Sequence, residues 1–429
     1  MAVLRVLLVV FLAAGCAVSR EAPSPPGPPA SATASPSASP SPAAITAGFV
    51  PSVGSPGASQ LVLAAPAPTL DTALAVGAKI DLHRFAVDRA PRDVLMTDWR
   101  EPGFGFTRLV PSWEAETPEG TWIIVEAQAR RASGGETAWY SLGRWAFGDA
   151  TVKRATVDGQ RDADARVDTD TLLASVPLSA YRLRVTLARN AGVSATAVLR
   201  SVAAVASADA GVRTGSRSAH TGVVKDLPVP QYSQEIHAGE YPEYDGGGEA
   251  WCSPTSTTMV LGFWGRGPTA ADVAWVDRRY QDPGVDHAAR YTYDATYGGT
   301  GNWAFNTAYA SQYGVRAFVT QLRSLAEAEL FIARGIPLVA SINVPPGGLP
   351  GFLYAQGTNG HLLVIRGFTA SGDVIANDPA ALSNAEVRRI YPRAAFERVW
   401  IGGSGGIVYV IHPADHALPE RVQGATANW

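Results

Sequence analysis

Cys252 is the residue of this chain whose neighbours most clearly indicate a reactive side chain. A run of glycines at 246–248 precedes it, and apolar residues recur at helical spacing over 259–264. We therefore expect a helix over 254–264 with Cys252 at or just before its first residue. There the helix dipole and unpaired backbone N–H groups favour a thiolate, and the N–H of Cys252 could donate to an oxyanion. The pattern predicts an activated nucleophile; the alternative is a buried cysteine acting as a small apolar residue.

A thiolate nucleophile needs a base, and His361 has the best position among the 7 histidines. It opens an apolar strand expected over 361–368, next to a loop of asparagine and glycine, which puts the imidazole at the rim of a sheet. A tight turn leads to a second strand, expected over 373–377. Because paired antiparallel strands bring their ends together, Asn377 or Asp378 can lie beside His361 and orient its ring.

Other kinds of chemistry have weaker support. There is no His-Glu-x-x-His motif and the histidines lack metal-ligand spacing, so we expect no metal and no other cofactor. Ser253 and Ser256 are not set in Gly-x-Ser-x-Gly, which argues against a serine hydrolase. The acidic run 158–170 lacks the order of an EF-hand loop, so we interpret it as a solvated loop. With 35 Lys+Arg against 38 Asp+Glu and a net charge of −3, nucleic acid is not an expected partner.

The candidate residues lie in a region of mixed helices and strands, 224–415. A capping box at 324–327 opens a helix expected over 325–334, which a glycine ends. Further strands are expected over 336–343 and 406–411. The mixture indicates an α+β domain.

The region before it, 61–208, shows short strands separated by turn residues. In the clearest, 181–187, every second residue is apolar. Other strands are expected over 104–109, 122–130, 138–145 and 195–201. This density of strands predicts an antiparallel β-sandwich. Four aromatic residues could stack on a sugar, although core or cross-strand packing is the preferred interpretation: Trp113, Trp139, Tyr140 and Trp145.

The beginning of the chain carries export signals. One arginine precedes an apolar run that is too short to span a bilayer, so we expect a signal peptide over 1–15. The run ends in Leu-Ala-Ala-Gly-Cys, which resembles the bacterial lipoprotein box, with Cys16 as the lipidated residue. Ordinary cleavage with an incidental Cys16 is the alternative. The stretch 16–60, rich in Pro, Ser and Ala, lacks the apolar surface to fold and is interpreted as a tether.

These signals predict an exported protein that is lipid-anchored at the extracellular face of the cell membrane. A linker over 209–223 and a tail over 416–429 complete the expected organisation. If Cys16 carries lipid, Cys252 is the one cysteine left for chemistry in an exported chain.

Several short motifs, taken as a set, resemble one known family. They are Val229-Pro-Gln-Tyr-Ser-Gln234, Trp251-Cys-Ser-Pro-Thr-Ser256, Gly301-Asn-Trp303, Gly335-Ile-Pro337, Gly360-His361 and Asn377-Asp-Pro379. Over 226–413 they resemble the papain-like domain of the bacteriocin-processing (double-glycine leader) cysteine peptidases, and more closely its exported actinobacterial "C thirty-nine-like" relatives. The resemblance implies Cys252 as nucleophile, His361 as base and Asp378 as orienter, with Asn377 as the alternative. The N-terminal sandwich also resembles a domain fused to these relatives.

Two positions depart from the family pattern. The resemblance implies a glutamine six residues before the nucleophile that helps form the oxyanion hole, and this chain has Gly246 there. Gln234 is the preferred substitute and Gln231 the alternative. The usual Cys-Gly-Pro is Cys-Ser-Pro here, which puts Ser253 where glycine would give the backbone more freedom.

Three functions are compatible with these patterns. We favour a cell-surface cysteine peptidase that cleaves an amide bond of a peptide or protein through a thioester intermediate. An amidase or transferase acting on cell-wall peptides would use the same residues. The third possibility is a non-catalytic surface binding protein in which the β-sandwich is the working part.

Overall fold

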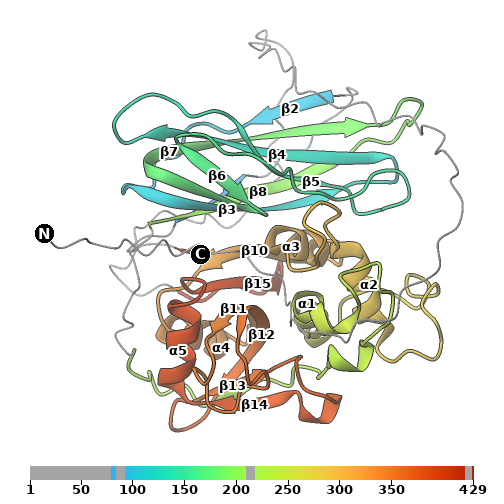
Figure 1. The fold of residues 1–429 in the computed structure, drawn as a ribbon, viewed down its shortest axis with the longest axis vertical. Helices are drawn as coiled ribbons and strands as arrows, with labels where there is room; N and C mark the ends of the chain where they lie inside the picture. Colours follow the sequence, from blue (N-terminus) through green and yellow to red (C-terminus); the bar gives the residue numbers. More distant parts are fainter. Residues whose placement is uncertain (1–78, 84–91, 209–217, 421–427) are drawn as a thin grey trace, which may run out of the picture.

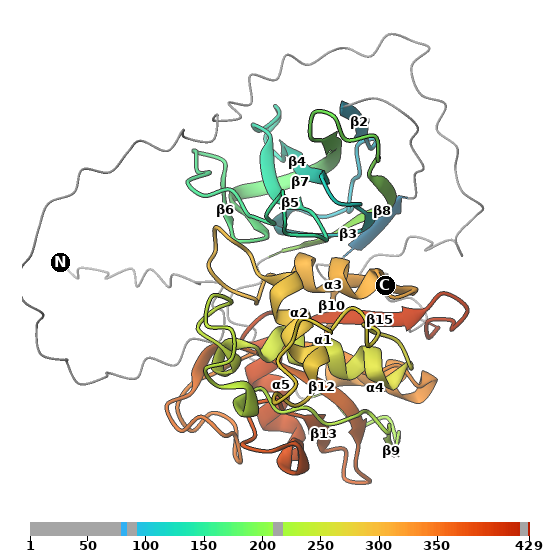
Figure 2. The ribbon, with the colours of Figure 1, turned by 90° about the vertical axis from the view of Figure 1, so that its right-hand side faces the viewer.

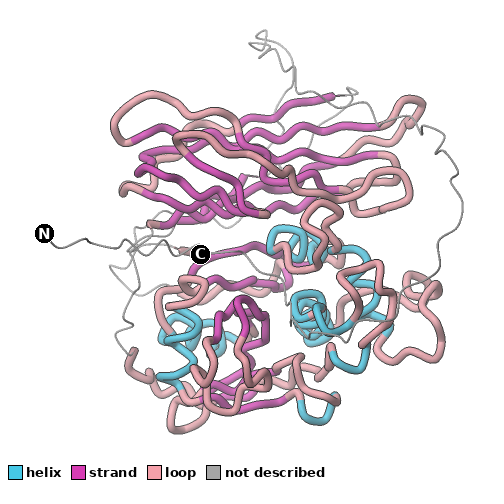
Figure 3. Tube along the Cα trace, viewed as in Figure 1, coloured by secondary structure: helices cyan, strands magenta, loops and turns pink. Residues whose placement is uncertain are grey.

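The computed structural model describes residues 79–83, 92–208, 218–420 and 428–429. They form an eight-stranded and a seven-stranded sheet, and every pairing between named strands is antiparallel. Figure 1 shows the first sheet above a second part that contains all the described α-helices, and Figure 3 shows the same division. The expected signal peptide, Cys16, the tether and residues 209–217 of the expected linker lie outside the described residues.

The first sheet is built around its longest strand, β7. Its strands are β1 (Lys79–His83), β2 (Arg92–Met96), β3 (Phe106–Glu116), β4 (Thr121–Arg131), β5 (Tyr140–Trp145), β6 (Ala165–Asp168), β7 (Thr171–Arg189) and β8 (Val198–Ser207). The order is β1-β8-β3-β7-β4-β5, and β2 and β6 also pair with β7. The expected antiparallel strands are thus present, and their arrangement as a two-layer sandwich stays a prediction.

Packing confirms the alternation expected over 181–187, because Tyr181, Leu183, Val185 and Leu187 are all buried. The preferred interpretation of the aromatic residues is also supported. Trp113 and Trp145 are completely buried against the ring of Phe305, and Tyr140 is 3 % exposed. Trp139 lies under the guanidinium groups of two arginines of β7, Arg182 and Arg184.

The second sheet has the order β10-β15-β11-β12-β13-β14, with β9 paired to β12. Its strands are β9 (Lys225–Asp226), β10 (Val315–Gln321), β11 (Leu338–Val344), β12 (Thr358–Phe368), β13 (Val374–Asn377), β14 (Arg388–Tyr391) and β15 (Ile407–Pro413). The helices are α1 (Cys252–Phe263), α2 (Pro283–Thr292), α3 (Trp303–Ser311), α4 (Leu325–Arg334) and α5 (Arg393–Ile401), with 3₁₀ turns η1 (Glu235–His237), η2 (Gly248–Ala250) and η3 (Asn384–Glu386). In Figure 1, α1 and α2 lie on one side of β11 and β12, and α5 lies on the other.

Helix α4 shows how local sequence signals determined element boundaries. It spans the expected residues, and Gly335 ends it in the left-handed conformation with φ 87°. The expected capping box is not formed, because the Ser324 side chain makes no cap hydrogen bond. The Glu327 carboxylate instead accepts the backbone N–H of Arg323 at 2.8 Å.

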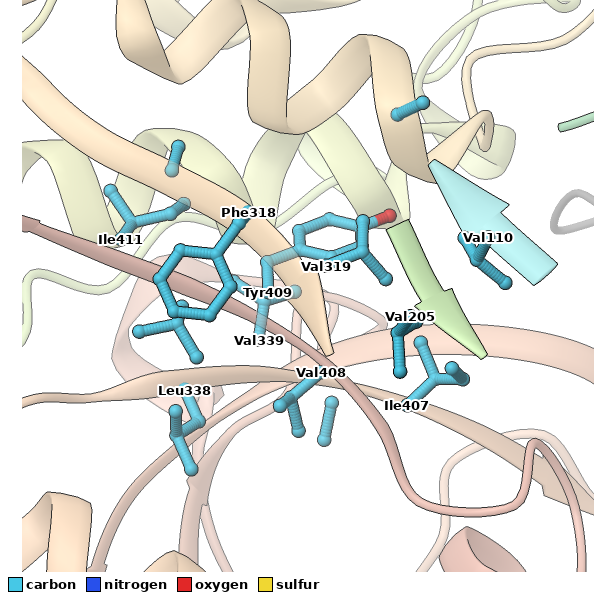
Figure 4. Packing of buried hydrophobic residues seen from close by; sticks show 14 of the residues in the cluster. Val110, Val205, Phe318, Val319, Leu338, Val339, Ile407, Val408, Tyr409 and Ile411 are labelled. Atoms are coloured by element: carbon cyan, nitrogen blue, oxygen red, sulfur yellow. The ribbon is translucent and has the colours of Figure 1, made fainter. Parts of the chain in front are cut away.

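The two parts share one continuous apolar core. Figure 4 shows Val110 and Val205, from β3 and β8 of the first sheet, beside Tyr409 and Ile407 of β15. All four side chains are at most 1 % exposed. Figure 2 shows the same contact from another side, with β3 and β8 next to α3 and β10. An apolar interface of this kind holds the two parts in a fixed relative position.

Polar contacts run along the same interface. The Arg316 guanidinium lies 2.7 Å from the Glu114 carboxylate, and Arg290 lies 2.8 Å from Asp149. Part of the expected tail also belongs to the core, since Trp429 is 1 % exposed and packs against Phe331. Among the described residues, no helix is both long and apolar enough to cross a bilayer.

Candidate active site

His361 and Asp378 meet at one end of the β12–β13 hairpin. The Nε2 atom of His361 lies 2.7 Å from Oδ1 of Asp378, and both residues are completely buried. Asp378 directly follows β13, whose last residue pairs with Val364 of β12. The hairpin therefore brings the two side chains together across 17 residues of sequence.

Two further donors hold the Asp378 carboxylate. The Tyr391 hydroxyl donates to Oδ2 at 2.6 Å, and the backbone N–H of Ala380 donates to Oδ1 at 3.0 Å. Burial alone would raise the pKa of Asp378, but the charge and hydrogen bond of His361 and the Tyr391 hydroxyl outweigh it, so the pKa lies below its usual value. Asp378 therefore stays a carboxylate and can fix the ring orientation and tautomer of His361.

Asn377, the alternative residue for orienting His361, has different partners. Its side-chain N–H donates to the Pro230 carbonyl at 2.8 Å, and its oxygen accepts from Arg366 at 2.9 Å. These bonds fasten the segment before α1 to the sheet. The structure thus brings Asp378 rather than Asn377 to His361.

Cys252 is the first residue of α1, as the sequence indicated, and is 1 % exposed. Ser256 lies one turn further along the helix and donates to the Leu362 carbonyl at 3.1 Å. Residues four apart share one face of a helix, so Cys252 and Ser256 both face the beginning of β12. The helix therefore directs Cys252 toward the strand end that carries His361.

Ser253, which departs from the family pattern, has a defined partner. Its hydroxyl lies 2.9 Å from the Tyr409 hydroxyl of β15, and both side chains are completely buried. The serine thus connects the first turn of α1 to the sheet.

Gln234 lies against the turn that leads into Cys252. Its side-chain N–H₂ donates to the Glu249 carbonyl at 2.5 Å and to the Tyr354 hydroxyl at 3.2 Å. The residue is completely buried, and its side-chain oxygen has no hydrogen-bond partner among the described residues. The alternative, Gln231, accepts from the backbone N–H of Arg388 at 3.1 Å. Of the two glutamines, Gln234 is the one that donates to the turn preceding Cys252.

The glycines before Cys252 allow this close approach. A Cβ atom on Gly248 would lie 2.2 Å from the Gln234 carbonyl oxygen and 2.6 Å from Cβ of His237. Gly247 has a φ of 109°, a conformation that side chains rarely adopt. The glycine-rich pattern therefore reflects backbone packing as well as the approach to a helix.

Aromatic residues of the β11–β12 connection cover His361, a feature that sequence reasoning missed. The rings of Phe352 and Tyr354 lie 5.6 and 5.7 Å from the imidazole, both edge-on. The Tyr354 hydroxyl donates to Glu235 at 2.8 Å, and burial raises the pKa of Tyr354 well above its usual value. These rings exclude water from the pair that His361 forms with Asp378.

The acidic run is a solvated loop only in its first part: residues 158–159 and 161–163 are exposed, whereas residues 164–170 are partly or completely buried. Asp170 is 2 % exposed and accepts the backbone N–H groups of Trp303 and Ala304, at 2.5 and 3.4 Å, at the start of α3. Burial raises the pKa of Asp170 to about 6, although these hydrogen bonds act to lower it. Asp164 pairs with Arg131 at 2.5 Å. Asp170 thus connects the first part to a helix of the second. The expectation fails at this end of the run because it ignored contacts between the two parts.

A cavity opens beside the candidate site, between the two parts. Its lining includes Asp170, Trp303 and Arg108, together with Gly360 and Leu362 on either side of His361. The first part therefore forms one wall of a space that reaches the strand end carrying the imidazole.

A second polar cluster was also missed by sequence reasoning. His237, Glu240 and Asp286 place their side-chain donor atoms within 4.8 Å of one another. Burial, and the proximity of Asp286, raise the pKa of Glu240 to about 7, although His237 opposes this. The spacing of His237 and Glu240 in the sequence was the available signal, but Asp286 comes from a separate helix.

Comparison with known families gives the class of the chain. Residues 226–406, which contain all the candidate catalytic residues, match the Peptidase_C39 like family. Residues 55–207 match the Peptidase C39 N-terminal domain. The two matches together support a C39-like peptidase family, and this family supports a peptidase of the cysteine type.

Other comparisons add no functional information. A search of curated proteins finds no match. Two solved structures, of the infectious bursal disease virus Gx and Gt strains, show 11% and 9% identity, each with a TM-score of 0.19. The aligned parts cover 32% and 33% of this chain and 35% and 32% of those chains, so this chain spans about a third of their length. Similarity at this level supports no conclusion about the fold or the function of this chain.

Proposed function

We propose that the chain is a thiol-dependent peptidase in which Cys252 is the nucleophile, His361 the general base and Asp378 the group that orients the base. The observation that carries the proposal is the buried hydrogen bond between His361 and Asp378, next to the strand end that the first turn of α1 faces. A nucleophile at a helix start, a base and an orienting carboxylate form the arrangement needed for acyl transfer.

The proposed reaction begins with proton transfer from the Cys252 thiol to Nδ1 of His361, because Nε2 faces Asp378. The thiolate attacks the amide carbonyl carbon, a C–S bond forms, and the carbonyl electron pair moves to oxygen. The tetrahedral intermediate collapses with cleavage of the C–N bond, and the leaving amine takes the proton from His361. Water then attacks the thioester, His361 accepts its proton, and the carboxylic acid and the thiol are released.

Two donors would stabilise the oxyanion: the backbone N–H of Cys252 and the side-chain N–H₂ of Gln234. The longer of the two Gln234 bonds, 3.2 Å to the Tyr354 hydroxyl, is the one an oxyanion would replace. The bond to the Glu249 carbonyl would keep the amide in position throughout. Donors that are fixed before the reaction stabilise the developing charge most effectively.

The proposal includes a location and a fold for each part. The signal peptide and lipidated Cys16 would place the enzyme at the extracellular face of the membrane, at the end of the 16–60 tether. The second part would be a papain-like α+β domain and the first a β-sandwich. Substrates would be peptides, proteins or cell-wall peptides that enter beside the cavity between the two parts.

Thiol labelling tests whether Cys252 is activated. Iodoacetamide modification of the full chain after reduction of its cysteines, measured against pH with the site identified by mass spectrometry, should show Cys252 reacting well below pH 8. A thiol that stays unreactive until near the unperturbed pKa of about 8.5 contradicts the catalytic role and leaves the surface-binding function as the better explanation.

Substrate assays with the natural chain and with Cys252→Ala distinguish a protein-cleaving peptidase from an amidase or transferase that acts on cell-wall peptides. We expect the natural chain to cleave casein or a peptide library and the variant to be inactive. Cleavage of purified peptidoglycan alone would favour the amidase or transferase. Equal cleavage by the variant would show that the assigned nucleophile is wrong. Ser371→Ala, on an exposed turn, is the matched control.

A further inference from the structure

His237, Glu240 and Asp286, here called the His237 cluster, form a compact group of side chains outside the proposed catalytic residues. His237 ends η1, Glu240 lies in the following turn, and Asp286 lies in the first turn of α2. Nδ1 of His237 is 2.7 Å from Oε2 of Glu240 and 3.5 Å from Oδ2 of Asp286. Three potential metal-binding groups from two separate segments therefore converge on one point.

The cluster is buried and incompletely satisfied. His237 and Asp286 are 0 % exposed and Glu240 is 8 % exposed. Within the described part of the chain, both carboxylate oxygens of Asp286 and Nε2 of His237 lack a hydrogen-bond partner. Buried carboxylate oxygens are almost always hydrogen-bonded or bound to a metal. Apart from the 3.5 Å approach of His237 Nδ1, the described residues offer the Asp286 carboxylate no polar partner, and a bound cation would fill this role.

His237 is the one basic group that the described surroundings place beside the two carboxylates. In the described ranges, neither Glu240 nor Asp286 forms an ion pair with an arginine or lysine. The His237 ring lies 5.9 Å from the Trp251 ring, and Trp251 belongs to a small buried apolar cluster with Val285 and Ala289. Burial opposes protonation of His237, but the nearby Asp286 and Glu240 outweigh it and raise the pKa of the imidazole. A divalent cation would take the place of the protons that the cluster otherwise holds and would balance the charge of the two carboxylates.

We propose that the His237 cluster is a binding site for a divalent transition-metal ion of the Zn²⁺ or Mn²⁺ type. One imidazole nitrogen and two carboxylate oxygens are ligands that suit these ions. Ca²⁺ and Mg²⁺ fit less well, because they prefer an all-oxygen ligand set. The donor atoms already lie within 4.8 Å of one another, so small side-chain movements would bring them to coordination distances.

The bound ion would fix the segment that carries Gln234. The backbone N–H of His237 donates to the Gln234 carbonyl at 3.1 Å, and Gly248, just before α1, packs against both residues. An ion bridging His237 and Asp286 would cross-link this segment to α2. The role is structural, so the proposal does not depend on the chemistry assigned to Cys252.

Metal analysis of the untagged full chain tests the site directly. After incubation with Zn²⁺ or Mn²⁺ and exhaustive dialysis, we expect about one equivalent of metal per chain, and a melting temperature raised by roughly 5 °C over the EDTA-treated protein. Asp286→Asn keeps the side-chain shape but weakens a ligand, so it should lose most of the bound metal and of this shift. Glu243→Gln, an exposed carboxylate in the same segment, should behave like the natural chain.

Other outcomes overturn the proposal. Equal metal content in Asp286→Asn and in the natural chain would mean that the ion binds elsewhere. A chain that retains no metal, combined with an Asp286→Asn variant at least as stable as the parent, would mean that the cluster holds a shared proton instead. Stabilisation by Ca²⁺ or Mg²⁺ but not by Zn²⁺ or Mn²⁺ would contradict the assigned class of ion.

Discussion

Nε2 of His361 lies 2.7 Å from Oδ1 of Asp378, and neither side chain is exposed to solvent. The contact fixes one imidazole nitrogen and therefore determines which nitrogen can exchange a proton with a substrate or a thiol. Tyr391 strengthens the arrangement by holding the second carboxylate oxygen. The pair is thus preorganised by the fold before any substrate binds.

Replacing Asp378 tests this relationship. Asp378→Asn should lower kcat by about 10²- to 10⁴-fold with little change in KM, because the amide cannot stabilise a protonated imidazole or enforce its tautomer. Steady-state kinetics with circular dichroism to verify folding would measure the effect. Asp373→Asn, on the turn of the same hairpin, is the control and should keep its activity. A folded Asp378→Asn variant with unchanged kcat would refute the orienting role.

The two glutamines give a matched test of the oxyanion hole. Gln234→Ala should lower kcat by about 10²- to 10³-fold, the usual effect of removing one preorganised donor. Gln231→Ala should have little effect on kcat, because this side chain accepts from the Arg388 backbone N–H instead. Single-turnover kinetics would isolate the chemical step. The reverse order of effects would identify Gln231 as the donor.

Asp170 is expected to stabilise the contact between the two parts. Asp170→Ala leaves the first N–H groups of α3 without their acceptor and should lower the free energy of unfolding by about 1–3 kcal/mol. Urea denaturation would measure the change. Asp158→Ala, an exposed residue of the same acidic run, should change stability by less than about 0.5 kcal/mol. Equal effects of the two substitutions would mean that the Asp170 contacts add nothing to stability.

His287 should make the protein sensitive to acid. Burial lowers its pKa from 6.5 to about 4, and its Nδ1 lies 3.0 Å from the Tyr309 hydroxyl. As the pH falls from 6.5 toward 4, the unfolded chain takes up a proton that the folded protein excludes, so stability is lost over this window. The difference corresponds to about 3 kcal/mol.

The measurement compares unfolding free energies of the natural chain and His287→Gln at pH 7 and pH 4.5. Because other groups also titrate in this range, the relevant quantity is the difference between the two proteins. The variant should lose less stability on acidification. Parallel losses in both proteins would show that the His287 imidazole is not kept neutral by burial.

Local patterns predicted much of the second part correctly. Helix α4, the β12–β13 hairpin and the position of Cys252 at the start of α1 were all expected from periodicity and turn residues. Such signals act over a few residues and survive in the folded protein wherever tertiary contacts reinforce them. Helices α2 and α5 were not anticipated, since their patterns are short.

The contacts between distant residues were the part that the sequence could not supply. In the sequence, Asp170 is one of several acids in an acidic run, and only the fold shows that it accepts the backbone N–H at the start of α3. The aromatic cover of His361 and the meeting of His237 with Asp286 likewise depend on the paths of long connections. The periodicity of apolar residues indicates local helices and strands. It does not indicate which distant segments come into contact in the folded chain.

The sequence by itself determined the chemical types: a cysteine at a helix start, a histidine opening a strand, and an asparagine and an aspartate ending the next one. It left open which of Asn377 and Asp378 faces His361 and which of Gln234 and Gln231 contacts the turn before Cys252. The tertiary structure decided both choices. The physical reason is that adjacent residues on a strand point to opposite faces, so only the packed hairpin fixes which side chain reaches the imidazole.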